Sequence, residues 1–123
     1  MKLHQSNTSG LNLFTHIDAT DFGINDLRYR GNIAVLPAEV IQQWTASSLE
    51  TLSEADFAFI AKIDVDIVLL GTGPTLRFPP RQLMRPLYMI GRGVEVMDTP
   101  AACRTFNILC AEGRKVGAFL LVA

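Results

Sequence analysis

The sequence has few of the residues on which the common site chemistries depend. Two cysteines and two histidines are too few for a disulfide-rich scaffold, and they make a metal centre improbable. Positive and negative side chains nearly cancel to a formal charge of −1, so no net field attracts nucleic acid. The longest apolar run, residues 116–123, is far shorter than the roughly 20 residues that span a bilayer. We therefore expect no nucleic-acid binding, no membrane insertion and no metal.

The amino terminus also lacks recognisable targeting patterns. Residues 1–10 contain neither the apolar core of a signal peptide nor the Arg-rich amphipathic pattern of a mitochondrial presequence. The chain as given is therefore predicted to be cytoplasmic. Cys103 and Cys110 both fall in a predicted helix, where a rise of about 1.5 Å per residue holds them roughly 10 Å apart, too far for a disulfide. Two reduced thiols are expected.

The first part of the chain has the pattern of short strands. Residues 11–17 and 26–30 alternate apolar with polar side chains, as half-buried strands do. Gly31-Asn32 follows, a pair suited to a two-residue hairpin turn, which predicts residues 33–36 as the returning strand. That strand should stop at Pro37, which cannot donate to a sheet.

From Ser53 the pattern alternates between helices and strands. Ser53 and Asp56 match a capping box, with an accepting hydroxyl at the start of a helix that runs to about residue 62. The mainly apolar residues 65–70 predict a buried strand. A second helix is expected over 80–90, kinked or split by Pro86, which removes a hydrogen bond inside a helix.

The last third predicts a strand, a helix and a strand. After the strand at 94–97, Thr99-Pro100 places an N-cap hydroxyl before a proline, and the helix should end at Gly113. Residues 116–122 then form a buried strand. We expect a single domain over 1–123, with 49% apolar residues to fill its core, a β-rich part over 11–46 and a βα-alternating part over 53–122.

Several segments carry a resemblance to a known family: Leu-Leu-Gly-Thr-Gly at 69–73, Phe-Pro-Pro at 78–80 and above all Gly-Val-Glu-Val-Met-Asp-Thr at 93–99. The chain resembles a small single-domain family of undefined molecular function. Its eukaryotic relatives include a mitochondrial respiratory complex I assembly factor and an adipogenesis-associated protein. The resemblance implies a three-layer α/β domain with a central mixed sheet, flanking helices and a smaller β-rich amino-terminal portion. It allows a last strand antiparallel to its neighbours, and periodicity does not fix that direction.

One ligand crevice follows if the strands at 65–70 and 94–97 run parallel. The loops after them then emerge at the edge where open α/β sheets bind ligands. Backbone N–H groups of both loops would face an anion, and arginines would supply charge. The candidate ligand-binding residues are Gly71, Thr72, Gly73, Arg77, Glu95, Thr99, Cys103 and Arg104.

Structural interpretations compete with this hypothesis. Leu76 stands where a dinucleotide fingerprint has glycine or alanine, so a tight turn is the favoured role of the two glycines. The four-residue spacing of Arg77, Arg81 and Arg85 is more typical of a solvated face.

The remaining candidates have structural interpretations of their own. Cys103 would be the obvious nucleophile but has no base nearby in the pattern, which favours a buried apolar cysteine. Glu95 lies in an apolar strand, and three placements are open: half exposed, paired with an arginine, or held in the crevice with a shifted pKa. Pairing is favoured, because an uncompensated buried charge is costly. Asp98 is favourably placed beside a helix N-terminus.

Two functions remain open. Because no catalytic pattern emerges, the leading hypothesis is a non-catalytic protein-interaction or assembly-type domain without a cofactor, with unidentified protein partners and a homodimer left open. The alternative is a small anionic-ligand-binding protein or minor enzyme that uses the crevice between the loops at 71–73 and 98–99. A crevice filled by Leu76, Phe78 or Met97 would remove the basis of the alternative.

Overall fold

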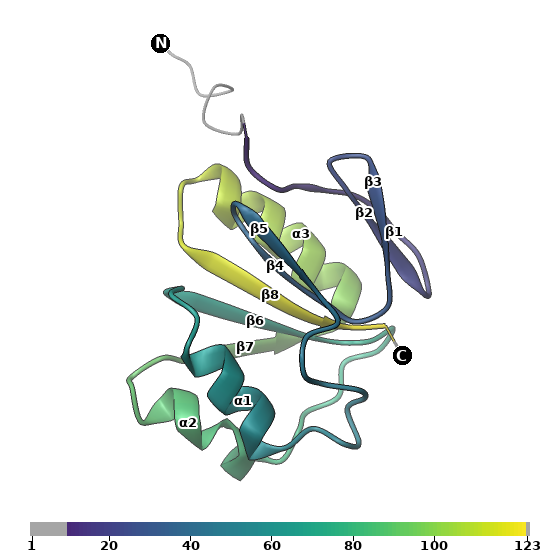
Figure 1. Cartoon of the computed structure of the whole chain (residues 1–123). Coiled ribbons are helices and arrows are strands. Elements are labelled where there is room, and N and C mark those ends of the chain that lie inside the picture. Colours follow the sequence, from purple (N-terminus) through teal and green to yellow (C-terminus); the bar gives the residue numbers. More distant parts are fainter. Residues whose placement is uncertain (1–9, 123) are drawn as a thin grey trace.

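The computed structural model describes residues 10–122, which form two sheets and four helical segments (Figure 1). The smaller sheet has the order β1-β2-β3 and the larger sheet the order β5-β4-β8-β6-β7. The strands are β1 (Phe14–Ile17), β2 (Asp21–Ile24), β3 (Leu27–Arg30), β4 (Ile33–Leu36), β5 (Glu39–Gln42), β6 (Ile67–Thr72), β7 (Val94–Met97) and β8 (Val116–Leu121). The helical segments are α1 (Glu54–Ala61), the 3-10 helix η2 (Arg81–Met84), α2 (Arg85–Tyr88) and α3 (Thr99–Ala111).

Both faces of the five-stranded sheet are covered, which makes three layers. Side chains alternate across a strand, so Leu69 of β6 faces α3 and the smaller sheet, whereas Val68 and Leu70 face α1 and α2. Figure 1 shows α1 and α2 on one side of this sheet and α3 with the smaller sheet on the other. The three-layer α/β class with a mixed central sheet is therefore confirmed.

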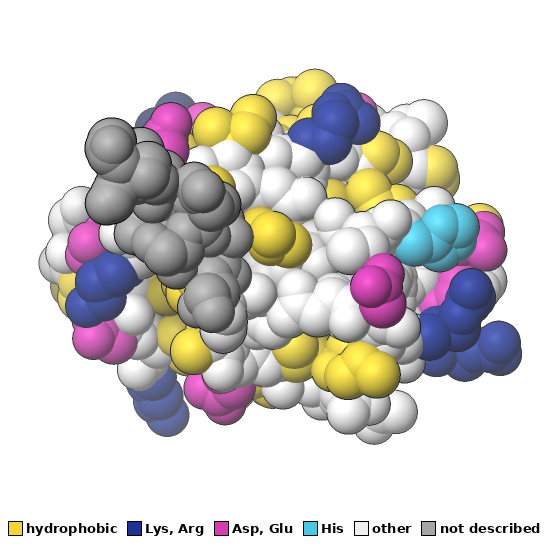
Figure 2. Space-filling view, turned by 90° about the horizontal axis from the view of Figure 1, so that it is seen from above, with side chains coloured by type: hydrophobic (Ala, Val, Ile, Leu, Met, Phe, Trp, Pro, Cys, Tyr) yellow, Lys and Arg dark blue, Asp and Glu magenta, His cyan; other side chains and the backbone are white. Residues whose placement is uncertain are grey.

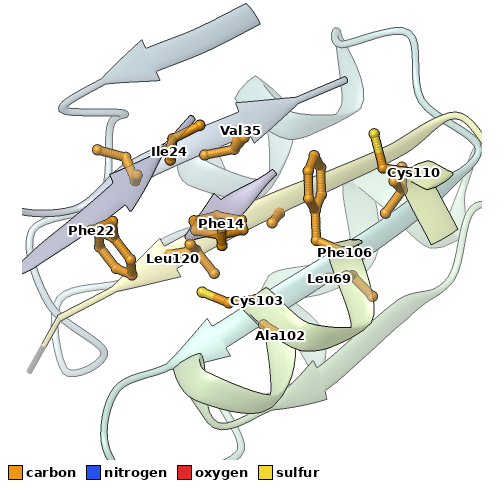
Figure 3. Close-up of a cluster of buried hydrophobic side chains, with 13 residues drawn as sticks. Phe14, Phe22, Ile24, Val35, Leu69, Ala102, Cys103, Phe106, Cys110 and Leu120 are labelled. Carbon is orange, nitrogen blue, oxygen red and sulfur yellow. The ribbon is translucent and has the colours of Figure 1, made fainter. Parts of the chain in front are cut away.

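Aromatic residues join the smaller sheet to the rest of the core. Phe14 of β1 makes edge-to-face contacts with Phe22 at 5.9 Å and with Phe106 of α3 at 5.5 Å between ring centroids. Figure 3 shows these rings in one cluster with Leu120 and the two cysteines. The smaller sheet is thus anchored on α3, which positions its β1–β2 turn near the start of that helix.

The strand directions support the predicted crevice and show the direction of the last strand, which the sequence left open. β6 runs parallel to β7, as the crevice requires. β8 runs antiparallel to β4 but parallel to β6, so the last strand opposes only one of its neighbours. The carboxyl ends of β6, β7 and β8 therefore lie at the same edge of the sheet.

The predicted hairpin at Gly31-Asn32 is wrong, because β3 and β4 belong to different sheets. At this passage from one sheet to the other, the Asn32 side chain bonds to distant parts of the chain. Its amide donates to the Ser47 carbonyl, and its oxygen accepts the N–H of Val122. The hairpin of the small sheet turns instead at Asn25-Asp26, both at positive φ, between Ile24 and Leu27. Strands β2 and β5 were not predicted.

Other boundaries follow the sequence more closely. β4 ends at Leu36, before Pro37, as expected, and α3 ends before Gly113, which has a φ of +81°. α1 begins after Ser53, whose N–H donates to the Asp56 carboxylate at 2.9 Å. The helix expected over 80–90 is split into η2 and α2, with Pro86 in the first turn of α2, where its missing N–H is tolerated.

Candidate functional site

The loops after β6 and β7 meet through reciprocal hydrogen bonds between Gly73 and Thr99. The Thr99 N–H donates to the Gly73 carbonyl at 2.8 Å, and the Gly73 N–H donates to the Thr99 hydroxyl at 2.8 Å. That hydroxyl donates in turn to the Leu121 carbonyl at 2.6 Å. One buried threonine side chain thus joins the exits of β6 and β7 to the end of β8.

The predicted N-cap at Thr99 is wrong by one residue. Asp98 is the N-cap, and its carboxylate accepts the N–H of Ala101 at 2.8 Å. Thr99 is the first helical residue, and its hydroxyl is bonded to Gly73 and Leu121 instead of capping the helix. The expected favourable placement of Asp98 beside the helix N-terminus is confirmed.

Gly71 and Thr72 lie in strand β6 rather than in the loop, because the strand extends two residues beyond the predicted end. A Cβ on Gly71 would lie 2.8 Å from the Leu120 side chain and 3.0 Å from the Thr99 Cα, so only glycine allows this close approach. The Thr72 hydroxyl donates to the Thr75 carbonyl at 2.7 Å and accepts the Arg77 N–H at 3.1 Å. Both residues have structural roles at the junction.

A surface hollow of about 260 Å³ opens at this junction. It is lined by Ile17, Asp18, Ala19, Phe22, Gly73, Pro74, Thr99, Pro100 and Val122. Of the predicted site residues, only Gly73 and Thr99 line it. The wall from the β1–β2 turn was not predicted, since alternation within β1 does not show that the small sheet packs beside α3.

The two predicted arginines lie away from the hollow. Arg77 forms an ion pair with Glu50 at 2.6 Å, and this hydrogen bond lowers the pKa of the Glu50 carboxyl. Arg104 is exposed on α3. Leu76 and Phe78 are exposed too, and neither they nor Met97 fill the crevice.

Glu95 does not form the expected ion pair with any residue in the described range 10–122. It lies on the edge strand β7 and is exposed. Because its carboxylate keeps its water, no desolvation penalty requires a partner.

Cys103 is fully buried in the cluster between α3 and the small sheet (Figure 3). Burial raises the pKa of the Cys103 thiol to about 12, a larger effect than the opposing charge of Arg104. The thiol is therefore protonated at neutral pH, which confirms the apolar interpretation of this residue.

The described chain has no other centre of recognisable chemistry. Within residues 10–122, no three His, Cys, Asp or Glu side chains are grouped as metal ligands. Over the same range, no helix has the length and apolarity that a membrane crossing requires. The junction contains the Thr99 hydroxyl, two glycines and the Asp98 carboxylate that caps α3. The hydrogen bonds described above all join one group of the protein to another.

The fold and this junction define the class of the protein: a three-layer α/β protein in which parallel strands deliver two loops to one edge beside a small antiparallel sheet. The chain belongs to the protein family of unknown function DUF498/DUF598, whose model matches residues 14–121. This family assignment confirms the resemblance inferred from the sequence.

Known relatives extend this assignment. The chain is 41% identical over 103 residues to the bovine (Bos taurus) NADH dehydrogenase [ubiquinone] 1 alpha subcomplex assembly factor 3. That match covers 81% of the chain and 55% of the bovine protein, so the chain spans about half the length of this relative.

Solved structures share the fold. A crystal structure from Bordetella parapertussis is 34% identical, with a TM-score of 0.82 over 91% of this chain and 96% of that one. A Bordetella pertussis protein described as a Mth938-like domain is 31% identical, with a TM-score of 0.77 over 98% and 92% of the two chains.

Proposed function

We propose that this chain is a non-catalytic, assembly-type domain that acts by binding a protein partner. The relatives named as an assembly factor of the NADH dehydrogenase 1 alpha subcomplex support this proposal, because they match over 81% of the chain. The family itself has no defined molecular function, so a surface suited to a partner is the main support for protein binding.

The observation that carries the proposal is a concentration of exposed apolar side chains in residues 76–90, here called the 76–90 segment. Five of the seven large hydrophobic residues exposed in the described chain lie in it: Leu76, Phe78, Tyr88, Met89 and Ile90. Met89 is 72% exposed and Phe78 70%. The opposite face, seen from above in Figure 2, carries apolar side chains interspersed with charges of both signs. A contiguous group of exposed apolar residues is typical of interaction sites, and five such residues within fifteen positions of the chain favour one here.

The same segment is anchored on one side and charged on the other. Met84 and Leu87 are buried in one cluster with Phe57 and Ile60 of α1, and this packing holds η2 and α2 against α1. Figure 1 shows α2 beside α1. Arg81 is exposed, as is Arg85 one turn later.

The local charge is of one sign, since residues 76–92 contain four arginines and no acidic residue. Arg77 is paired with Glu50, whereas Arg81 and Arg85 form no ion pair within residues 10–122. A partner with an apolar and acidic surface is complementary to this segment.

Site-specific photocrosslinking in living cells tests the proposal. A photoreactive benzoylphenylalanine at Met89 should give adducts with one or a few proteins that belong to a larger complex. The matched control places the same probe at Ile108, which is 60% exposed on α3. The double charge reversal Arg81→Glu with Arg85→Glu should weaken the Met89 adducts, whereas Arg104→Glu should leave them unchanged.

Three results would contradict protein binding by this surface. The first is the same set of adducts from Met89 and from Ile108. The second is the absence of protein adducts from Met89 in a chain that is folded and expressed. The third is a set of adducts with lipid alone.

A further inference from the structure

The hollow at the Gly73–Thr99 junction presents an apolar surface that the described chain leaves uncovered. Phe22 and Thr99 are buried residues of its lining. Ile17, Pro100 and Val122 are half-buried there, and their apolar atoms form much of the wall. The hollow therefore offers contact area to an apolar group.

Backbone donors that could bind an anion are already used inside the protein. Besides the reciprocal bonds of Gly73 and Thr99, the Ala19 N–H donates to the Asp18 carboxylate at 2.6 Å and the Val122 N–H donates to the Asn32 side chain at 2.8 Å. The Asp18 N–H donates to the Asp21 carbonyl at 2.9 Å. The two prolines of the lining have no N–H. The chemistry of the hollow is thus unlike that of the predicted anion site.

The one charged residue of the lining is an acid. The Asp18 side chain is 55% exposed, so its carboxylate is accessible to an incoming cation. His16 lies 3.8 Å from it and competes only when its imidazole is protonated. Charge complementarity therefore selects a cationic group next to an apolar one.

The size of the hollow favours a side chain over a free cofactor. Its volume of about 260 Å³ is below the roughly 300–1,000 Å³ of small-molecule sites. Protein interfaces commonly place one apolar or aromatic anchor in such a pocket, with polar contacts at the rim.

We propose that this hollow is a docking site for one apolar side chain of a protein partner, adjacent in the partner's sequence to a lysine or arginine that pairs with Asp18. The contact is separate from the 76–90 segment, so each surface can fail its test independently. No covalent step is involved.

Selection from a random peptide library on the intact chain tests this proposal at mildly alkaline pH. The enriched peptides should share an apolar residue next to lysine or arginine. The strongest peptide, added to the isotope-labelled chain, should shift the amide resonances of Ile17, Phe22 and Val122 more than those of the 76–90 segment. This measurement needs no variant, so it stands even if a substitution prevents folding.

Three variants and a control distinguish the contribution of the apolar anchor from that of the ion pair. Ala19→Trp fills the hollow from its exposed wall and should weaken the selected peptide at least tenfold, whereas Ile108→Trp on α3 should have no effect. Asp18→Asn should weaken it about twofold to fivefold, as expected for one exposed ion pair. Asp18→Lys should change the preferred neighbour of the anchor from basic to acidic.

Four outcomes would overturn the proposal. They are the absence of a shared apolar–basic pattern, undiminished binding to a folded Ala19→Trp chain, amide shifts confined to other surfaces, and binding of butylammonium as tight as that of the peptide. The last outcome would identify the hollow as a site for free amines.

Discussion

The Thr99 hydroxyl forms two of the hydrogen bonds that hold the junction together, so its removal tests how much these bonds stabilise the fold. Thr99→Val keeps the branched shape and nearly the volume of the side chain, so it creates no cavity. It removes the acceptor of the Gly73 N–H at 2.8 Å and the donor to the Leu121 carbonyl at 2.6 Å. Since the residue is only 4% exposed, water cannot readily replace these partners.

The expected loss follows from the two groups left behind. Each buried polar group that loses its partner destabilises a protein by about 1–3 kcal/mol, so Thr99→Val should lower the free energy of unfolding by about 2–6 kcal/mol. That is a large share of the roughly 5–15 kcal/mol by which domains are stable. Thr99→Ser keeps the hydroxyl and loses one methyl group, at about 1 kcal/mol. The difference in unfolding free energy between the two variants therefore measures the hydrogen bonds separately from the packing.

Denaturant unfolding followed by tryptophan fluorescence measures both variants. Trp44 is the sole tryptophan, is buried, and contacts Phe119 edge-to-face, so its emission reports on the core. Hydrogen exchange adds a local readout, because the Gly73 amide should exchange faster in the valine variant than in the serine variant. If the two variants unfold within about 0.5 kcal/mol of each other with equal m-values, the hydroxyl is not what holds this junction.

Three further predictions concern the same core. Gly71→Ala should lower the free energy of unfolding by about 1–3 kcal/mol, because its methyl group would lie 2.8 Å from the Leu120 side chain. Gly93→Ala, at a position with open space and no positive φ, controls for the general effect of replacing a glycine, and an equal loss there would refute the steric explanation. Cys103 should react with a thiol reagent only after unfolding, and rapid labelling of the native chain would contradict its burial. Because its pKa rises from 9.0 to about 12 on folding, the unfolded chain loses the proton first, so stability should fall as pH rises from about 9 to 12, with a smaller slope in Cys103→Ala.

Local sequence patterns were sufficient to predict a helix or strand where the residues that determine it are adjacent in sequence. Strand β7 and helix α3 follow from alternation, a cap, an N-terminal proline and Gly113, all within twenty consecutive residues. Even there, the N-cap is Asp98 and not the predicted Thr99, because the Thr99 hydroxyl is bonded to Gly73 and Leu121. A contact between distant strands decided which of two suitable residues caps the helix.

The small sheet could not be placed from its own residues. Gly31-Asn32 has the composition of a hairpin turn, yet Asn32 is bonded to Ser47 and Val122, far away in the chain. The alternation of β3 is compatible with pairing on either side, and the packing of Phe14 on Phe106, which anchors the separate sheet, joins residues far apart in the chain. The hollow was missed for the same reason, since one of its walls belongs to that sheet.

The predicted crevice and the observed junction share a location but differ in what remains available to a ligand. Parallel strands do bring the two loops together, and an empty edge of this kind would expose N–H groups to an anion. Here the Thr99 N–H donates to the Gly73 carbonyl and the Gly73 N–H donates to the Thr99 hydroxyl. An anion would have to displace one of these internal hydrogen bonds to reach either N–H. An apolar side chain needs no such exchange, because it buries the surfaces of Pro100 and Val122 without competing for a donor. On this energetic ground, a protein segment is a better occupant of the junction than an anion.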